Sequence, residues 1–406
     1  MKASDLLVID VAGELQAVCR EQLRGSWQVA AELARFGLQR GAAAVDVTSL
    51  RNGFSLRCPG ASLGPDELTR LNTLCVRSAD LGQRHDAVEG LEASRAEALL
   101  WAVGVEGSRV EVTAWQGGAK SSLRARLDGG STLDRTDCPG RTNGFEIRVT
   151  SPGLDRRRTL RWLETALRFA PVPVRIDGER HDGGFEQCLF ETRIDRPMTG
   201  RIAVTSTGDA PHLWLLRHGV LATRAAVPGF PAFEAALEMA PLVRAGAGPD
   251  ELREAVNPHL PALIDRAVSL MVESADRLPS LADEPRDRLT CLLLRAARVG
   301  LQRERILALP VVRVADGSHA TRWWSLDQIA AGGRTVFACD TPDRVHRDTA
   351  CGGVPVVVAS SEQRGLLAEV VGVALQQVPR QPWRFSPRGA AAALHRRLEG
   401  VLQSMW

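Results

Sequence analysis

Hydrophobic residues recur with a helical period near the start of the chain and alternate with polar residues further along. Val29, Leu33 and Phe36 fit the 3.6-residue period of an amphipathic helix, which predicts a helix over residues 27–40 after another near 12–24. Further helices are predicted from residue 64, over 94–103 and over 157–169, and strands at 43–49, 53–57, 109–115, 121–127, 144–149 and 172–176. Helices interleaved with mostly antiparallel strands predict an α+β fold, a two-layer α/β sandwich over residues 1–182.

The rest of the chain is expected to form two further units and a tail. Residues 183–308 predict a middle domain with strands at 190–193, 200–206 and 212–217, which turns helical from Ala232 onward. Residues 309–376 predict a small α/β domain with strands at 310–314, 335–339 and 354–359 and a helix over 363–376. Residues 377–406 combine a Pro- and Arg-rich segment with a final helix.

The composition is that of an ordinary globular protein, and it narrows the choice of partners. Hydrophobic residues make up 44% and charged residues 24% of the 406 positions, which suits two or three domains with cores of their own. A net charge of +3 gives little reason to expect a nucleic-acid partner. The sequence has no apolar run of membrane-spanning length and no secretory pattern at its start, so we expect a cytoplasmic protein without membrane contact.

The cysteines favour neither a metal site nor a redox site. The eight of them are scattered without C-x-x-C spacing, so we expect reduced thiols. Cys339 and Cys351, with His346 between them, come nearest to a metal cluster, but their spacing fits no standard ligand pattern. The sequence therefore predicts no bound metal.

One stretch carries a resemblance to a known superfamily. Residues 29–47 combine an amphipathic helix, a Gly-Ala step and a strand, which resembles the first ATP-binding motif of the GHKL ATPases and is most similar in layout to MutL and heat-shock-protein-90 proteins. MutL-like members write this helix E-L-x-E-N-x-x-D-A-G-A, where a Glu activates water and the Asn binds magnesium. In this chain Glu32 occupies the position of the base, Phe36 replaces the Asn and Gln39 replaces the Asp.

The resemblance continues, with substitutions, over about residues 20–180. In the family's D-x-G-x-G motif, the Asp binds the adenine amine. In this chain Cys58 stands at the position of that Asp, and Ser62 stands at the position of the second Gly. The lid motif G-F-R-G-E-A-L is matched by residues 93–99, where Ala93 and Ala96 replace the two glycines. The resemblance implies a GHKL (Bergerat) sandwich followed by a heat-shock-90-like middle region and a small C-terminal α/β unit.

The substitutions disfavour ATP chemistry on physical grounds. Magnesium requires hard oxygen ligands, which Phe36 lacks, and we expect its ring to fill the space of metal and phosphates. Cys58 is a poor acceptor for an adenine amine, a loss of about 1–3 kcal/mol, and the lid alanines crowd the approach of backbone amides to phosphate. The nucleotide positions therefore predict a degenerate pocket with no cofactor: Glu32, Phe36, Gln39, Cys58, Ser62, Ala93 and Ala96.

Other positions leave alternatives open. Because no Lys follows Lys120, a middle-domain contact to a γ-phosphate would need an Arg, for which Arg244 and Arg253 are candidates. Trp323, Trp324 and Trp383 serve either core packing or a protein-binding hot spot.

Three functional hypotheses follow from these patterns. The first is a non-catalytic pseudo-ATPase that binds another protein as a scaffold or regulatory subunit. The alternative is a chaperone-like ATPase with a remodelled pocket, in which Glu32 is the general base and ATP with magnesium the cofactors. The third is a MutL-like nucleic-acid binder that uses the Arg-rich segment 154–161.

Overall fold

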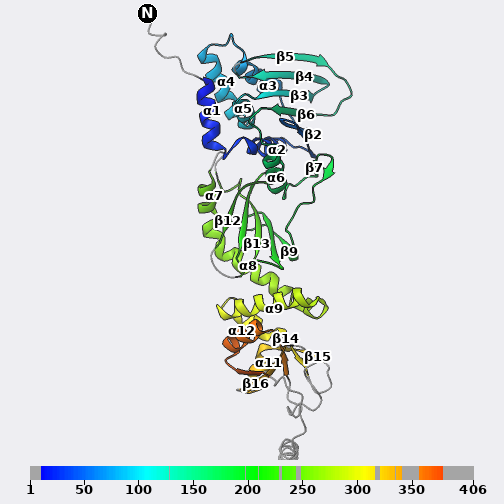
Figure 1. Ribbon diagram of the computed structural model, residues 1–406, viewed down its shortest axis with the longest axis vertical. Coiled ribbons are helices and arrows are strands. Elements are labelled where there is room, and N and C mark those ends of the chain that lie inside the picture. The colour runs from blue at the N-terminus through cyan, green and yellow to red at the C-terminus, as the bar shows by residue number, and fades with distance from the viewer. Residues whose placement is uncertain are drawn as a thin grey trace, which may run out of the picture.

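In the residues that the structure describes, the chain forms three β-sheets that follow one another along the long axis of the molecule (Figure 1). The structure is a computed structural model, and it describes residues 11–127, 129–196, 198–208, 210–227, 231–243, 248–315, 321–333, 335–340 and 356–377. The mixed α+β architecture with sheets rich in antiparallel pairs confirms the expected fold class.

The first sheet has eight strands in the order β5-β4-β3-β6-β2-β1-β7-β8. Its strands are β1 (Val45–Leu50), β2 (Gly53–Pro59), β3 (Arg109–Gln116), β4 (Ala119–Arg126), β5 (Gly130–Asp137), β6 (Gly144–Thr150), β7 (Val174–Ile176) and β8 (Glu179–Arg180). All neighbouring pairs are antiparallel except β1 with β7. The strand β5 was not expected from the sequence, because seven of its eight residues are polar or glycine.

Helices cover one face of this sheet, and the other face is open. The helices are α1 (Val11–Gln22), α2 (Val29–Gln39), α3 (Pro65–Cys75), α4 (Leu81–Ala93), α5 (Glu97–Gly104) and α6 (Arg156–Ala166). Val110 and Val112 of β3 are buried while Glu111 between them is not, the alternation of a sheet with one covered face. On the open face Arg124 and Arg148 lie 3.9 and 3.8 Å from Glu111. The first unit is therefore a two-layer structure.

The second sheet has the order β12-β11-β13-β10-β9, and both of its faces are covered. Its elements and the helices that follow are β9 (Cys188–Ile194), β10 (Gly200–Thr205), β11 (His212–Arg217), β12 (Val220–Ala226), β13 (Glu234–Glu238), α7 (Pro249–Val256), α8 (Leu260–Glu273), α9 (Asp283–Arg298) and α10 (Arg303–Ala308). Trp214 and Leu216 of β11 pack into the core of the first unit, whereas Leu213 and Leu215 pack into a second core with α8. The sheet thus joins the first unit to the rest of the molecule.

The expectation of helix from Ala232 onward is wrong for residues 234–238 and is confirmed further along, where α8 and α9 are long helices. Residues 234–238 form β13, a central strand parallel to β11 and antiparallel to β10. Ala, Leu and Glu favour a helix when the chain is read alone. In the fold Ala236 belongs to the first core, while Ala235 and Leu237 belong to the second. Pairing with two strands and burial on both faces override the local helix preference.

The third sheet has the order β15-β14-β17-β16-β18 and shares the second core. Its elements are β14 (Pro310–Ala315), β15 (Thr321–Ser325), α11 (Leu326–Ala331), β16 (Thr335–Cys339), β17 (Val356–Val358), α12 (Ser361–Val371) and β18 (Ala374–Gln377). The helix expected over 363–376 ends earlier, because Gly372 adopts the left-handed backbone (φ 73°) that terminates helices, and the residues after it form β18.

Candidate functional site

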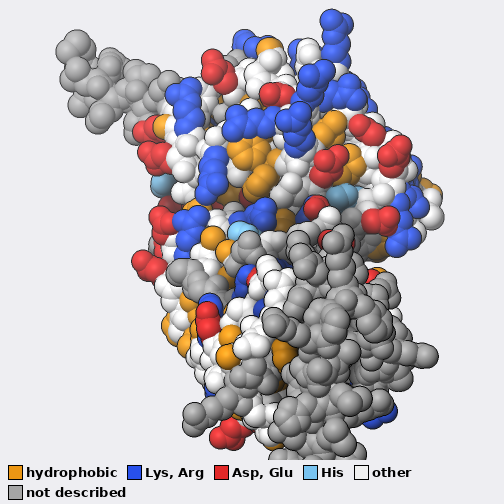
Figure 2. Space-filling model, turned by 60° about the horizontal axis from the view of Figure 1, so that its bottom comes forward, with side chains coloured by type: hydrophobic (Ala, Val, Ile, Leu, Met, Phe, Trp, Pro, Cys, Tyr) orange, Lys and Arg blue, Asp and Glu red, His pale blue; other side chains and the backbone are white. Residues whose placement is uncertain are grey.

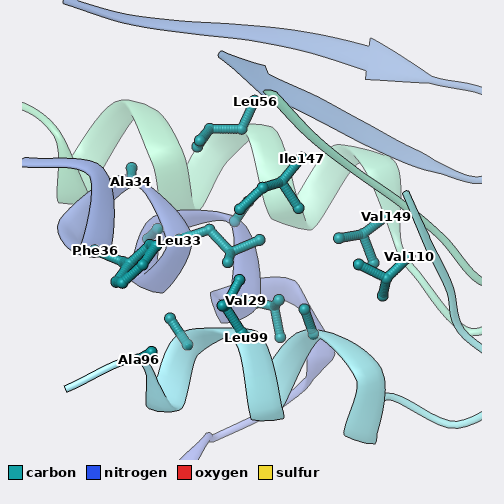
Figure 3. Packing of buried hydrophobic residues seen from close by; sticks show 14 of the residues in the cluster. Val29, Leu33, Ala34, Phe36, Leu56, Ala96, Leu99, Val110, Ile147 and Val149 are labelled. Atoms are coloured by element: carbon teal, nitrogen blue, oxygen red, sulfur yellow. The ribbon is translucent and has the colours of Figure 1, made fainter. Parts of the chain in front are cut away.

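The inner face of α2 packs directly on the first sheet. Figure 3 shows Val29 and Leu33 of α2 in the same buried layer as Leu99 of α5 and Ile147 of β6. A side chain at Gly37 would collide with the sulfur of Cys58 on β2, so only glycine allows this approach between helix and strand. The space between α2 and the sheet is therefore filled by side chains of the core.

Phe36 lies in this filled space. Its side chain is 2% exposed, and its ring centroid lies 5.6 Å from that of Phe145 on β6. The guanidinium of Arg40 lies 5.1 Å from the Phe36 ring centroid. The position that the resemblance assigns to the magnesium ligand thus holds an aromatic ring enclosed by a second ring and a cation.

Arg40 ties the end of α2 to the lid segment. Its Nη2 donates to Glu67 Oε1 of α3 at 3.0 Å and to the carbonyl of Ser94 at 2.7 Å. The carbonyl of Arg40 accepts from the amide of the half-buried Ser62 at 3.2 Å. Of the expected lid positions, Ala93 is exposed at the end of α4 and Ala96 is fully buried. These contacts hold the lid segment against the core.

Cys58 is enclosed in the same layer. It is fully buried, and burial, with an additional effect of Asp46, raises the pKa of its thiol to about 12. The thiol is therefore protonated at neutral pH and neither a nucleophile nor a useful acceptor.

The outer face of α2 faces a large cleft instead. Glu32, Arg35 and Gln39 line a cavity of about 1100 Å³ between the first unit and the second. Its first wall comes from α1, α2, α4 and α5, and its second wall from the β11–β12 turn and from residues of the 240–252 segment. Phe36, Cys58, Ser62, Ala93 and Ala96 do not line it. The structure therefore separates Glu32 and Gln39 from the other expected pocket positions.

Glu32 is engaged by its neighbour on the helix. Its carboxylate forms an ion pair with Arg35, one turn further on, and both side chains are about four-fifths buried. The Arg35 guanidinium also lies 5.7 Å from the ring centroid of Trp101 on α5. The possible general base is thus held in a fixed place on the wall of the cleft.

A hairpin of the second unit supplies the facing residues. His218 and Gly219 join β11 to β12 with positive φ angles of 50° and 77°, the pattern of a type I′ turn. Glu238 accepts the amides of His218, Gly219 and Ala240 at 3.0, 2.9 and 3.1 Å. A side chain at Gly219 would collide with Pro171 of the first unit, so the turn rests directly on that unit.

Three residues of this hairpin, Arg217, His218 and Ala222, line the cleft. Burial lowers the pKa of His218, and Arg35, Arg95 and Arg217 lower it further against the opposing effect of Glu238. Burial also lowers the pKa of Arg217, with Arg35 adding to the effect while Glu32, Glu251 and Glu238 oppose it. Charged groups of both units therefore converge at the tip of the hairpin.

The sequence had suggested two other arginines, Arg244 and Arg253, as the middle-domain residues that would reach a γ-phosphate. Arg253 pairs with Asp250 at 2.7 Å on its own helix and does not line the cleft, and Arg244 lies outside the described residues. His218-Gly219 between two apolar runs suggests a hairpin, because Gly readily adopts the positive φ angle that a tight turn requires. A hairpin signal does not say what the turn will face, so Arg217 was missed.

The tryptophan candidates are half-buried. Trp323 and Trp324 lie on the edge strand β15 and pack against the second core. Trp383 lies outside the described residues. Each of the two described side chains thus contributes to packing and keeps part of its surface accessible.

The Arg-rich segment 154–161 begins α6 and has structural contacts. Arg158 lies 4.5 Å from the ring centroid of Trp27, and Arg156 lies 3.9 Å from Asp177 and donates to Ser49 at 3.1 Å. On the face of the molecule seen in Figure 2, basic side chains lie among acidic and hydrophobic ones.

The described part of the chain also bears on metal binding and on membrane crossing. There, His, Cys, Asp and Glu residues do not gather in groups of three or more that could hold a metal ion. No described helix combines the length and apolarity needed to cross a bilayer.

Comparisons with known proteins show similarity at the level of structure and not of sequence. No family model matches the chain, and no curated protein matches it. Among solved structures, the ATPase region of Saccharomyces cerevisiae topoisomerase II is similar, with a TM-score of 0.34 and 10% sequence identity, over 49% of this chain and 61% of that one. The chain thus covers less than two thirds of that structure.

Proposed function

We propose that the protein is a non-catalytic pseudo-ATPase of the GHKL type whose second and third sheets correspond to a heat-shock-90-like middle region and a small C-terminal unit. In this proposal it acts on other proteins as a scaffold or regulatory subunit. The observation that carries the proposal is the burial of Phe36 between Phe145 and Arg40. An aromatic ring supplies no oxygen for magnesium.

Binding a nucleotide between α2 and the sheet would require several losses at once. The Phe36 ring would have to leave the core, which costs about 1.5–3 kcal/mol for a buried apolar side chain. The contacts of Arg40 with Glu67 and the Ser94 carbonyl would have to open. Adenine would then meet a protonated Cys58 thiol in place of a carboxylate. Each of these losses lowers the affinity for a nucleotide at this place, and the losses add together.

Titration calorimetry with Mg-ATP tests the pseudo-ATPase proposal. We expect no heat of binding at micromolar nucleotide and no phosphate release by the full chain. Micromolar affinity together with turnover that Glu32→Gln abolishes would refute the proposal, because both require an open pocket and a working base.

A second candidate function is supported by the cleft. Glu32 of the first unit and Arg217 of the second line one cavity, an arrangement that an ATPase with a remodelled pocket could use. This function predicts that Mg-ATP raises the melting temperature, as a ligand of the native state must. An unchanged melting temperature at millimolar Mg-ATP would leave the pseudo-ATPase as the better proposal.

The scaffold role places protein contact at the edge of the third sheet. β15 ends the sheet and carries the half-accessible Trp323 and Trp324, and tryptophan is enriched at interface hot spots. If this edge is the contact, Trp323→Ala should abolish co-purification of a specific partner, whereas Trp27→Ala should not. Equal recovery with both variants would remove β15 from the proposal.

A further inference from the structure

The second sheet ends in an edge strand, β9. In the described part of the chain β9 is hydrogen-bonded to β10 alone, so the main-chain groups along its other side face no strand. Figure 1 shows β9 at the right-hand rim of this sheet. An edge of this kind is a template for a further strand, and proteins often protect it with Pro or Lys. The seven residues of β9 include neither.

The side chains of β9 alternate between two surroundings. Phe190 and Ile194 are buried in the second core, and Thr192 between them accepts a hydrogen bond from Arg266 of α8 at 3.3 Å. Successive side chains of a strand point to opposite faces, so Glu191 and Arg193 lie on the other face, where both reach the surface. That face of the edge therefore carries one charge of each sign.

These two charges can each take a partner from outside the chain. Glu191 forms an ion pair with Arg201 of β10, and its side chain keeps 27% of its surface exposed. A carboxylate has two oxygens, so it can bind a second guanidinium. For the guanidinium of Arg193 the described part of the chain records no ion pair. The edge thus offers one acceptor and one donor for charge-assisted hydrogen bonds.

The order of residues in β9 is complementary to itself. When two copies pair antiparallel about a two-fold axis at Thr192, Glu191 of each copy lies opposite Arg193 of the other, and Phe190 lies opposite Ile194. Opposite charges, paired threonines and an aromatic beside a β-branched residue are cross-strand pairs that stabilise a sheet. An axis at Glu191 or at Arg193 would instead place like charges opposite each other, so charge selects the register at Thr192.

Several other edge strands fit a second copy less well. β8 has two residues and β18 has four, and β12 is packed against α6 and α7. In β5 the register that opposes Arg135 and Asp137 is centred on Thr136, next to the end of the strand. Arg135 also donates to the Pro65 carbonyl and to Thr69 on α3, at 3.4 and 3.3 Å. β9 is therefore the better candidate.

We propose that two copies of this chain pair through β9 into a two-fold symmetric dimer, in which their five-stranded second sheets join into one continuous sheet. Main-chain hydrogen bonds along the edge and two symmetric pairs of Glu191 with Arg193 hold the copies together. A contact of one strand pair is small, so we expect the dimer to be in equilibrium with the monomer. The proposal goes beyond the pseudo-ATPase function, because neither α2 nor the cleft takes part.

Sedimentation velocity of the full chain over a concentration series tests the dimer, and we expect a reversible monomer–dimer equilibrium. Glu191→Arg and Arg193→Glu should each weaken the dimer at least about tenfold, which corresponds to about 1.4 kcal/mol, because each places like charges opposite each other twice. Mixed in equal amounts, the two variants should associate with each other, because the arginines of one copy then lie opposite the carboxylates of the other. A variant that is merely misfolded cannot give this rescue.

A matched control reverses a charge on a different edge. Asp134→Lys on β5 changes an exposed residue and should leave association unchanged, and thermal melting should show that all variants fold. A parent chain that stays monomeric at millimolar concentration would overturn the proposal. A dimer that both charge reversals leave intact, or a mixture that associates no better than either variant alone, would overturn it as well.

Discussion

The two faces of α2 contact different surroundings although they belong to one helix. On the inner face, Phe36 and Gly37 are buried against the sheet, where the thiol of Cys58 leaves room only for glycine. On the outer face, Glu32 and Gln39 line an open cleft that the second unit closes from the other side. The inner face is a packed core, and the outer face is the surface on which a ligand could act.

Under the proposed function, this difference is the reason why the helix of a motif persists while its site does not. Residues 32 and 36 are one turn apart and lie along the same side of the helix, but the ring of Phe36 is enclosed by Phe145 and Arg40, whereas Glu32 lies on the wall of the cleft. The position that resembles the metal ligand is therefore occupied by a core residue, while the position that resembles the base lies on the wall of the cleft. Three predictions test this contrast between the packed and the accessible surroundings of α2.

The largest effect is expected from Phe36→Ala. Removing a buried phenylalanine creates a cavity and should lower the free energy of unfolding by about 3–5 kcal/mol. Glu32→Gln, one turn earlier on the wall of the cleft, should cost less, about 1–3 kcal/mol, because Gln keeps the size of the side chain and an oxygen that can accept from Arg35. Urea denaturation measures both. A cost below about 1 kcal/mol for Phe36→Ala would mean that the inner face is not packed as described.

An intermediate effect is expected at the hairpin tip that closes the cleft. Gly219→Ala adds both backbone strain and a collision with Pro171, whereas Gly178→Ala, in the type I′ turn between β7 and β8, adds strain alone because nothing lies within 4 Å. The difference between the two variants should be about 1–3 kcal/mol, the usual cost of overpacking. Equal destabilisation would show that the hairpin does not rest on the first unit.

The smallest effect concerns pH. Because its pKa is lowered in the folded protein, His218 takes up a proton more readily in the unfolded chain, whose histidine pKa is about 6.5. Stability from this residue is complete above that pH and is lost as the pH falls below it. His218→Asn keeps the left-handed turn, which Asn tolerates.

Thermal melting between about pH 8 and pH 5 measures this contribution. The variant should lose less stability on acidification than the parent protein does. Identical pH profiles would place the imidazole outside the corner formed by the arginines.

The local patterns of the sequence predicted many helices and strands, because in those segments the residues themselves favour the structure that forms. The helix expected at 27–40 is confirmed as α2 within about two residues at each end, since its apolar stripe matches the face that it buries. The strands expected at 43–49 and 53–57 are confirmed as β1 and β2 for the same kind of reason, because their residues alternate and an Asn-Gly turn joins them. The functional roles assigned to Glu32, Phe36 and Cys58 stay predictions.

Failures occurred where distant contacts decided the outcome. The segment 234–238 has the composition of a helix, yet two neighbouring strands and two cores make it β13. The sequence shows a His-Gly turn but does not show that Pro171 lies beneath it. Arg217 was missed for that reason.

By itself the amino-acid sequence determined the period of each amphipathic segment, the turns and the residue types at the positions that resemble a magnesium ligand and an adenine acceptor. These properties depend on neighbours along the chain. Only the tertiary structure decided which face of α2 is closed and which is open, because that depends on β2, β6 and a hairpin about 180 positions away in the chain. Packing brings such distant segments together, and no local preference encodes which of them will meet.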